Sequence, residues 1–138
     1  MSVYLDASVL VPIFVDDDWS ERVVAWLETE PDVVVSDWTL AEFSSALSFH
    51  VRKGKLDPDE RDEAENSLNR WIEGSVTQVP VDPEDVWAAR DLLHAHPKLR
   101  APDALHLAIV KRLGEAFATY DTVLADAARR EAVDVLAP

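Results

Sequence analysis

Four acidic residues stand where predicted strands end or predicted helices begin: Asp6, Glu42, Asp103 and Asp121. Asp6 directly follows a short run of β-prone residues, and Asp121 follows another. Glu42 and Asp103 lie near the starts of two segments with helical spacing. Because the carboxyl ends of parallel strands lie at one edge of a sheet, all four carboxylates can converge there.

A cluster of four carboxylates needs a compensating charge, because like charges a few ångströms apart repel and raise one another's pKa values. The chain has no cysteine, and ligand sets made only of oxygen suit Mg²⁺ or Mn²⁺. Such a metal polarises a phosphoryl oxygen and lowers the pKa of a bound water. The four acids therefore predict hydrolysis of a phosphodiester bond. Ser8 and Thr119 have hydroxyls placed to orient a carboxylate, a water or a phosphate oxygen.

Each of these acids also has an ordinary structural interpretation. Asp6 and Asp121 are suitable helix N-caps. Thr39 and Glu42 have the spacing of a capping box, in which the glutamate binds an amide of its own helix. Asp103 in a first helical turn complements the helix dipole. These interpretations explain the acids one at a time, whereas a shared site explains their common placement.

The histidines offer a weaker signal for a metal site. His106 lies one turn after Asp103, and His94 and His96 have a spacing that resembles a metal-binding pair. A zinc site needs further ligands, and the sequence shows no identifiable partners for these residues. We therefore expect the three histidines to be structural. Asp126, five residues after Asp121, is expected to reach the acids only from the rim.

Short apolar segments alternate with helical patterns along the whole chain, which predicts an α/β fold with a mostly parallel sheet. Strands are expected at residues 3–5, 33–35, 76–81, 116–119 and 133–135. Helices are expected at residues 20–28, 39–53, 58–73, 83–94, 102–113 and 121–131. The apolar run 9–15 is interrupted by Pro12 and ends in three aspartates, so it is neither a signal peptide nor a membrane span.

Length and charge limit the classes of function. The chain has 138 residues, so we expect a single domain over residues 1–138. A formal net charge of −14 excludes a histone-like or sliding DNA-binding protein. The absence of cysteine gives no sign of an oxidising compartment, and a cytoplasmic location is the expectation. Basic residues that could flank a site for polyanions gather at two places: Arg52, Lys53 and Lys55, and Lys98 and Arg100.

Four blocks of this sequence together resemble a PIN domain of the VapC-type toxin family. They are Tyr4–Leu10 (YLDASVL), Thr39–Leu47 (TLAEFSSAL), Arg100–Ala108 (RAPDALHLA) and Thr119–Asp121 (TYD). Each block is short, but all four occur in the order of the family and span residues 4–121. Family sequences often have threonine where Ala7 stands, a difference that leaves the acids untouched.

The resemblance implies a single three-layer PIN domain that acts as a Mg²⁺- or Mn²⁺-dependent ribonuclease, is usually dimeric, and is held inactive by a cognate antitoxin. The catalytic acids of the family correspond to Asp6, Glu42, Asp103 and Asp121, and its supporting hydroxyls to Ser8 and Thr119. On this basis Asp6, Asp103 and Asp121 are the expected metal ligands. Glu42 either binds the metal or positions the attacking water, and the expected products carry a 5′-phosphate and a 3′-hydroxyl.

The charge distribution predicts how two partners would bind. Residues 1–50 contain ten acidic residues and one basic residue, so we expect this surface to bind a basic antitoxin segment. The basic residues at 52, 53, 55, 98 and 100 are expected to guide RNA. Two alternatives stay open: a PIN fold that serves only as an interaction module, and another metal-dependent phosphohydrolase. Ser8 argues against a haloacid-dehalogenase-like phosphatase, and the lack of a lysine after Asp121 argues against a receiver domain.

Overall fold

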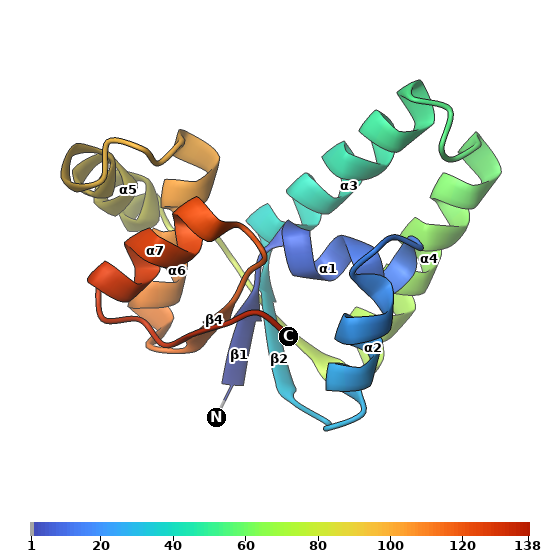
Figure 1. Cartoon of the computed structure of the whole chain (residues 1–138), viewed down its shortest axis with the longest axis horizontal. Coiled ribbons are helices and arrows are strands. Elements are labelled where there is room, and N and C mark those ends of the chain that lie inside the picture. The colour runs from blue at the N-terminus through green and yellow to red at the C-terminus, as the bar shows by residue number, and fades with distance from the viewer. Residues whose placement is uncertain (1) are drawn as a thin grey trace.

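A computed structural model describes residues 2–138 and contains a five-stranded sheet in the order β3-β2-β1-β4-β5 (Figure 1). The strands are β1 (Ser2–Leu5), β2 (Asp32–Ser36), β3 (Val76–Val79), β4 (Ala116–Ala118) and β5 (Val135–Leu136). Every neighbouring pair is parallel, and Val3 of the central strand is in register with Val33 on one side and Ala116 on the other. The sheet is thus entirely parallel, where the sequence predicts a mostly parallel one.

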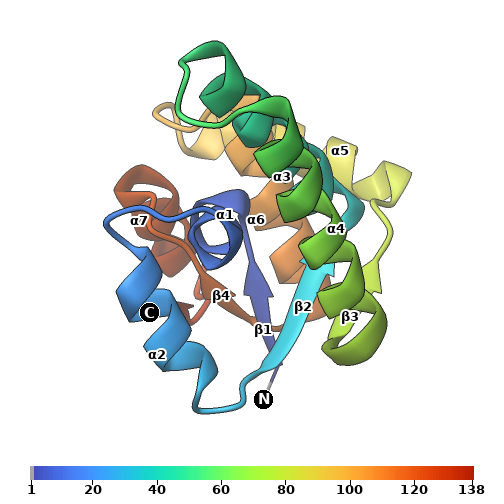
Figure 2. The ribbon, with the colours of Figure 1, turned by 90° about the vertical axis from the view of Figure 1, so that its right-hand side faces the viewer.

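Seven helices connect the strands in the described part of the chain: α1 (Ala7–Phe14), α2 (Ser20–Leu27), α3 (Asp37–Arg52), α4 (Pro58–Ser75), α5 (Pro83–Ala95), α6 (Ala101–Leu113) and α7 (Thr122–Arg130). Helices α1 to α4 cover one face of the sheet and α5 to α7 cover the other (Figures 1 and 2). Helices α3 and α4 form the predicted hairpin and run side by side in both views. The predicted three-layer α/β architecture is confirmed.

The two faces of the sheet form two separate cores, because successive residues of a strand point to opposite sides. In β1, Val3 and Leu5 pack with α1 to α4, whereas Tyr4 packs with α5 to α7. Strand β4 repeats this alternation, with Phe117 facing the second core. A strand that is buried on both faces reads as a continuous apolar run, which is why the sequence pattern predicts parallel strands correctly.

Helix α1 is the element that the sequence analysis does not predict. Pro12 lies inside it and lacks the N–H that would bond to the carbonyl of Ser8, so the sequence pattern does not predict a helix there. The helix forms because Asp6 caps its start, where its Oδ1 accepts a hydrogen bond from the backbone N–H of Val9. Its apolar side chains, among them Val9 and Leu10, are buried against the sheet. Among the described helices, none is long and apolar enough to cross a membrane.

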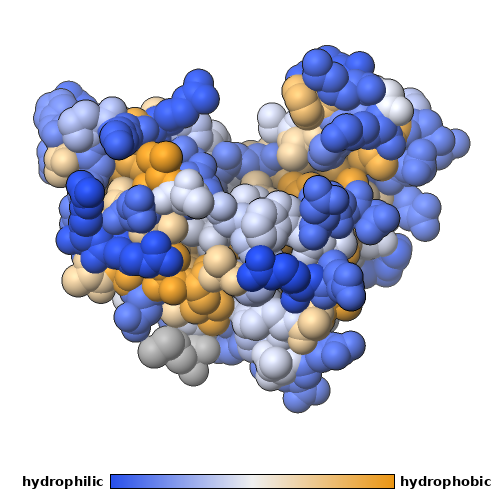
Figure 3. Space-filling view, in the orientation of Figure 1, coloured by the Kyte–Doolittle hydropathy of each residue, from blue (hydrophilic) through white to orange (hydrophobic). Residues whose placement is uncertain are grey.

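The strands all end at one edge of the molecule, where the two helical layers separate. The space-filling view shows the surface hollowed there, between the lobe formed by α5 to α7 and the lobe formed by α3 and α4 (Figure 3). Helices α1, α3 and α7 each begin no more than four residues after a strand ends, so their first turns border this hollow. The fold therefore brings helix starts together at the carboxyl edge of the sheet.

Candidate active site

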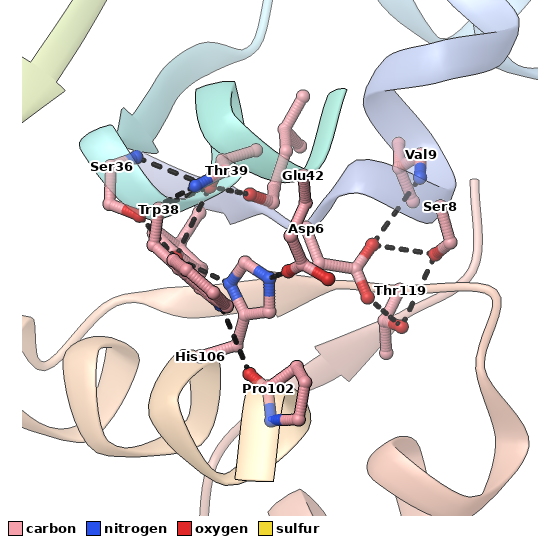
Figure 4. Close-up of polar contacts among 12 residues, drawn as sticks. Asp6, Ser8, Val9, Ser36, Trp38, Thr39, Glu42, Pro102, His106 and Thr119 are labelled. Carbon is pink, nitrogen blue, oxygen red and sulfur yellow. Dashed lines mark hydrogen bonds and ion pairs between the residues drawn. The ribbon is translucent and has the colours of Figure 1, made fainter. Parts of the chain in front are cut away.

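Asp6 is buried at the centre of this edge, where β1 ends and α1 begins, with 4% of its surface exposed. Its Oδ1 accepts a hydrogen bond from the hydroxyl of Ser8 at 2.6 Å, and its Oδ2 accepts one from the hydroxyl of Thr119 at 2.5 Å (Figure 4). Burial raises the pKa of Asp6 above its ordinary value, against the lowering effects of His106 and of these hydroxyls. Both predicted hydroxyls thus orient a carboxylate.

Asp121 approaches from the end of the neighbouring strand β4 and caps α7. Its Oδ1 accepts from the backbone N–H of Leu124 at 2.9 Å, and its own backbone N–H donates to the hydroxyl of Thr119 at 3.0 Å. Thr119 therefore links the carboxylate of Asp6 to the backbone of Asp121. The N-cap interpretation and the shared-edge interpretation both hold for this residue, because the cap uses only one of its carboxylate oxygens.

Asp103 reaches the same edge from the first turn of α6. Its pKa is raised to about 6, first because the side chain is partly buried and then because Asp121 and Glu42 lie close by with negative charge. His106 lowers this pKa, and Asp6 raises it further. The other three predicted acids therefore all lie close enough to Asp103 for their charges to affect its pKa.

Glu42 does not belong to the capping box that its spacing from Thr39 predicts, and this expectation is wrong. Helix α3 begins two residues earlier than expected, at Asp37, with Ser36 as its N-cap and Thr39 as its third residue. The hydroxyl of Ser36 accepts the backbone N–H of Thr39 at 3.1 Å, and the hydroxyl of Thr39 accepts the backbone N–H of Ser36 at 3.3 Å. Because Ser36 and Thr39 satisfy the helix start, the carboxylate of Glu42 is left to face the site.

His106 is the site residue that sequence reasoning assigned to a structural role. Its side chain is 1% exposed, and its Nε2 contacts the Oε1 of Glu42 (Figure 4). Its spacing of three residues from Asp103 on α6 was the available signal, because residues three apart share a helix face. His96 instead pairs with Glu131 at 2.6 Å, away from the four acids, as a structural histidine would.

A hydrogen bond links helices α3 and α6 beside this site, because the indole Nε1 of Trp38 donates to the carbonyl of Pro102 at 3.2 Å.

The PIN domain family model matches residues 3–130 of this chain. The chain belongs to the PIN-domain family. It is 31% identical to ribonuclease VapC46 of Mycobacterium tuberculosis over 99% of this chain and 98% of that protein, which places it with the VapC-type members.

Solved structures share the fold of this PIN domain. FitAcB from Neisseria gonorrhoeae is 26% identical and covers 99% of this chain and 97% of its own, with a TM-score of 0.69. VapC20 of Mycobacterium tuberculosis, described as a toxin that cleaves the sarcin–ricin loop, is 16% identical with a TM-score of 0.72. It covers 91% of this chain and 94% of its own, a likeness that bears on the fold alone.

One groove of this PIN domain is lined by one of the four acids, Glu42, and by a predicted basic position, Arg52. It has a volume of about 530 Å³, and its lining also includes Ser8 and Phe49. Arg52 and Lys53 lie over the ring of Phe49, with their charged groups 6.0 Å and 5.6 Å from its centre. Of the remaining predicted RNA-guiding residues, Lys55 lines a neighbouring groove, Lys98 lines a third, and Arg100 is the N-cap of α6.

The acids of this PIN domain do not form a closed metal site. Within residues 2–138, no three or more His, Asp or Glu side chains are arranged so that together they could hold a metal ion. The carboxylates of Asp6 and Asp121 are instead held by hydroxyl and amide donors of the chain itself. Asp126, whose side chain is 72% exposed, pairs with Arg129 at 3.6 Å.

Proposed function

We propose that this protein is a metal-dependent endoribonuclease, the toxin of a toxin–antitoxin pair. The observation that carries the proposal is that partly buried Asp103 lies close enough to Asp6, Glu42 and Asp121, at one edge of the sheet, for their charges to raise its pKa. Such a concentration of negative charge is unfavourable by itself and becomes favourable when a cation or a cationic partner binds. The name of the relative VapC46, a ribonuclease, supports RNA as the substrate.

The donor set of the site fits Mg²⁺ or Mn²⁺. The candidate ligands Asp6, Asp103 and Asp121 offer only carboxylate oxygens, which these hard cations prefer. Mg²⁺ commonly keeps several waters and binds through one or two carboxylates, so an open cluster suits it better than a closed cage. When bound, the metal would stabilise negative charge on the phosphate and activate a water.

Glu42 is proposed to take the proton of the attacking water. Its Oε1 is engaged by His106, so Oε2 is the oxygen that remains to accept the proton. Attack by this water at phosphorus breaks the bond to the 3′-oxygen, which takes a proton from solvent water, and the products carry a 5′-phosphate and a 3′-hydroxyl. Ser8 and Thr119 keep the carboxylate of Asp6 in one orientation during this reaction, because they hold both of its oxygens.

RNA is proposed to enter along the groove between Glu42 and Arg52. Arg52 and Lys53 would bind phosphates there, and Lys55, Lys98 and Arg100 would contact the strand beyond the groove. A cognate antitoxin with a basic segment is proposed to bind the acidic surface of residues 1–50, which carries nine more acidic than basic residues. A homodimer is proposed from the family. Reversing the charges of the basic residues should weaken RNA binding and spare antitoxin binding. Reversing the acidic charges of residues 1–50 should do the opposite.

Cleavage of total prokaryotic RNA by the purified, antitoxin-free protein tests the proposal. We expect cuts with Mg²⁺ or Mn²⁺ that EDTA prevents and that Asp103→Asn abolishes, with mapped products carrying a 5′-phosphate. Asp91→Asn is the matched control, because Asp91 is an exposed aspartate of α5 outside the acid cluster. This control should cleave as the wild type does.

The remaining outcomes separate the alternatives. Products that end in a 2′,3′-cyclic phosphate would contradict attack by water. Cleavage of a phosphate substrate other than RNA would favour a different metal-dependent phosphohydrolase. No cleavage, together with no binding in a Mn²⁺ titration, would favour a PIN fold that serves only as an interaction module.

A further inference from the structure

The buried imidazole of His106 lies between a phenol and a carboxylate. Its Nδ1 is 2.7 Å from the hydroxyl of Tyr4, and its Nε2 contacts Oε1 of Glu42. Tyr4 is fully buried and comes from the central strand β1, while Glu42 is 27% exposed and comes from α3. A buried polar ring is costly unless its nitrogens are hydrogen-bonded, and here both are. The ring therefore connects the core of the protein to the candidate active site.

The partner of each ring nitrogen limits where the protons lie. The carboxylate of Glu42 only accepts hydrogen bonds when ionised, so Nε2 of His106 must be the donor of that contact. Burial raises the pKa of Tyr4 above its ordinary value, so its phenol keeps its proton. With a carboxylate acceptor on one side and the phenol of Tyr4 on the other, the ring of His106 carries its donor on the side that faces the acids.

Tyr4 itself is held by the start of helix α3. Its hydroxyl lies 2.8 Å from the hydroxyl of Ser36 and 3.2 Å from that of Thr39, and Thr39 also donates to the carbonyl of Leu5 at 3.0 Å. Ser36 and Thr39 are the two residues that form the capping box of α3. The hydrogen-bond chain from this capping box through Tyr4 and His106 ends at Glu42, six residues along the same helix from Ser36.

We infer that His106 is a positioning residue, which holds Oε1 of Glu42 through Nε2–H so that Oε2 faces the attacking water, and that Tyr4 fixes the ring of His106. This inference rests on the proposed nuclease function for its catalytic consequence, but the contact itself is independent of it. Glutamate has three rotatable side-chain bonds, and an unfixed Glu42 would sample orientations that point away from the acids. The Nε2–H of His106, on the core side of Glu42, restricts the carboxylate to one orientation.

A purely structural His106 and a positioning His106 differ in the effect of two similar substitutions. In His106→Gln, the side-chain amide reaches the former place of Nε2 and keeps a donor for Glu42. In His106→Asn, the shorter amide reaches only the side of Tyr4. We expect His106→Asn to lower kcat by about 10- to 100-fold with little change in KM, as is typical when a residue that orients a catalytic group is lost. His106→Gln should keep most of the activity.

Tyr4→Phe removes the hydroxyl that fixes the ring and should lower kcat less than His106→Asn does, again at a similar KM. His94→Gln is the matched control, because His94 is an exposed histidine at the end of α5. Equal kcat values for the Gln and Asn variants of His106 would overturn the inference. So would a loss that appears only in KM.

The second measurement does not depend on activity. In the nuclear magnetic resonance spectrum of the full chain, we expect a downfield, slowly exchanging imidazole N–H that His106→Gln removes. Glu42→Gln should shift this resonance upfield, because a neutral acceptor replaces a charged one, while His94→Gln should leave it in place. If this imidazole N–H resonance is absent, or if Glu42→Gln does not shift it, the inference is overturned. This holds even if His106→Asn fails to fold. If the wild type cleaves no RNA, the proposed function fails and this spectrum alone decides the contact.

Discussion

The buried and partly buried acids at the carboxyl edge of the sheet and the buried Asp85 lie in opposite surroundings. At the carboxyl edge of the sheet, Asp6 is held by neutral hydroxyls, and the neighbours of Asp103 include three other carboxylates. On the face of the sheet that α5 to α7 cover, Asp85 of α5 is 2% exposed and accepts hydrogen bonds from Nε and Nη2 of Arg112 at 2.7 Å and 2.9 Å. Asp85 has an arginine as its charge partner, whereas Asp6 and Asp103 have none among the described residues.

The pKa values reflect this difference. Burial by itself raises the pKa of Asp85, but the hydrogen bonds and charge of Arg112, with the backbone N–H of Asp82, lower it below its ordinary value. For Asp103, burial and the nearby carboxylates act in the same direction and raise the pKa to about 6. The chain thus supplies a cation where a carboxylate stabilises the fold. Within the described residues it pairs no lysine or arginine with the four acids, where we propose that a metal binds.

The largest expected effect is the loss of catalysis in Glu42→Gln. Removing a group that accepts a proton in the transition state lowers kcat by about 10²–10⁴-fold. The melting temperature should change little, because the amide oxygen can still accept from His106. Steady-state cleavage of a defined RNA and thermal unfolding of the same samples measure both quantities. Retention of full kcat would remove Glu42 from the reaction.

Metal addition should stabilise the acid cluster and have no such effect at the Asp85 pair. At a concentration of 100 times its Kd, an ion that binds only the folded state adds about 2.7 kcal/mol to the free energy of unfolding. We expect Mn²⁺ to raise the stability of the wild type and of Arg112→Met by similar amounts. Asp103→Asn should respond less. Denaturant unfolding with and without Mn²⁺ measures these differences, and an equal response of Asp103→Asn would contradict the assignment of ligands.

Arg112→Met tests the opposite side of the comparison. It leaves Asp85 buried without its cation, which we expect to lower the free energy of unfolding by about 1–3 kcal/mol, less than for a fully buried pair because Arg112 is 31% exposed. Cleavage by the folded protein should be unchanged. Combining it with Asp85→Asn should cost less than the sum of the two single variants. Strict additivity in denaturant unfolding would show that the two side chains do not interact.

The smallest expected effect is a pH dependence of stability from Asp85. Its folded pKa lies below its unfolded value, so its contribution is fully present above the unfolded pKa and is lost as pH falls through the folded pKa. We expect the stability difference between the wild type and Asp85→Asn, on the order of 1 kcal/mol, to hold at neutral pH and to shrink below about pH 4. Asp91→Asn is the exposed control. A difference that grows with acidity would reverse the sign of the assignment.

Sequence periodicity predicted most of the fold. All five predicted strands and all six predicted helices are present among the five strands and seven helices described, because buried parallel strands and amphipathic helices leave strong local patterns. Helix α1 was missed because Pro12 interrupts a run that is apolar on every side. The start of α3 was misplaced because two residues three apart, Ser36 and Thr39, form a capping box just upstream of the Thr39–Glu42 spacing.

The sequence by itself determined the alternation of strands and helices, the excess of acidic residues and the four acids at predicted element ends. These features depend on residues that are near in the chain or on composition. Only the tertiary structure decided that Asp85 pairs with Arg112, 27 residues away, and that His106 contacts Glu42, 64 residues away. Such pairs leave no local pattern, because α3, α5 and α6 come together only when the parallel sheet has placed them on its two faces.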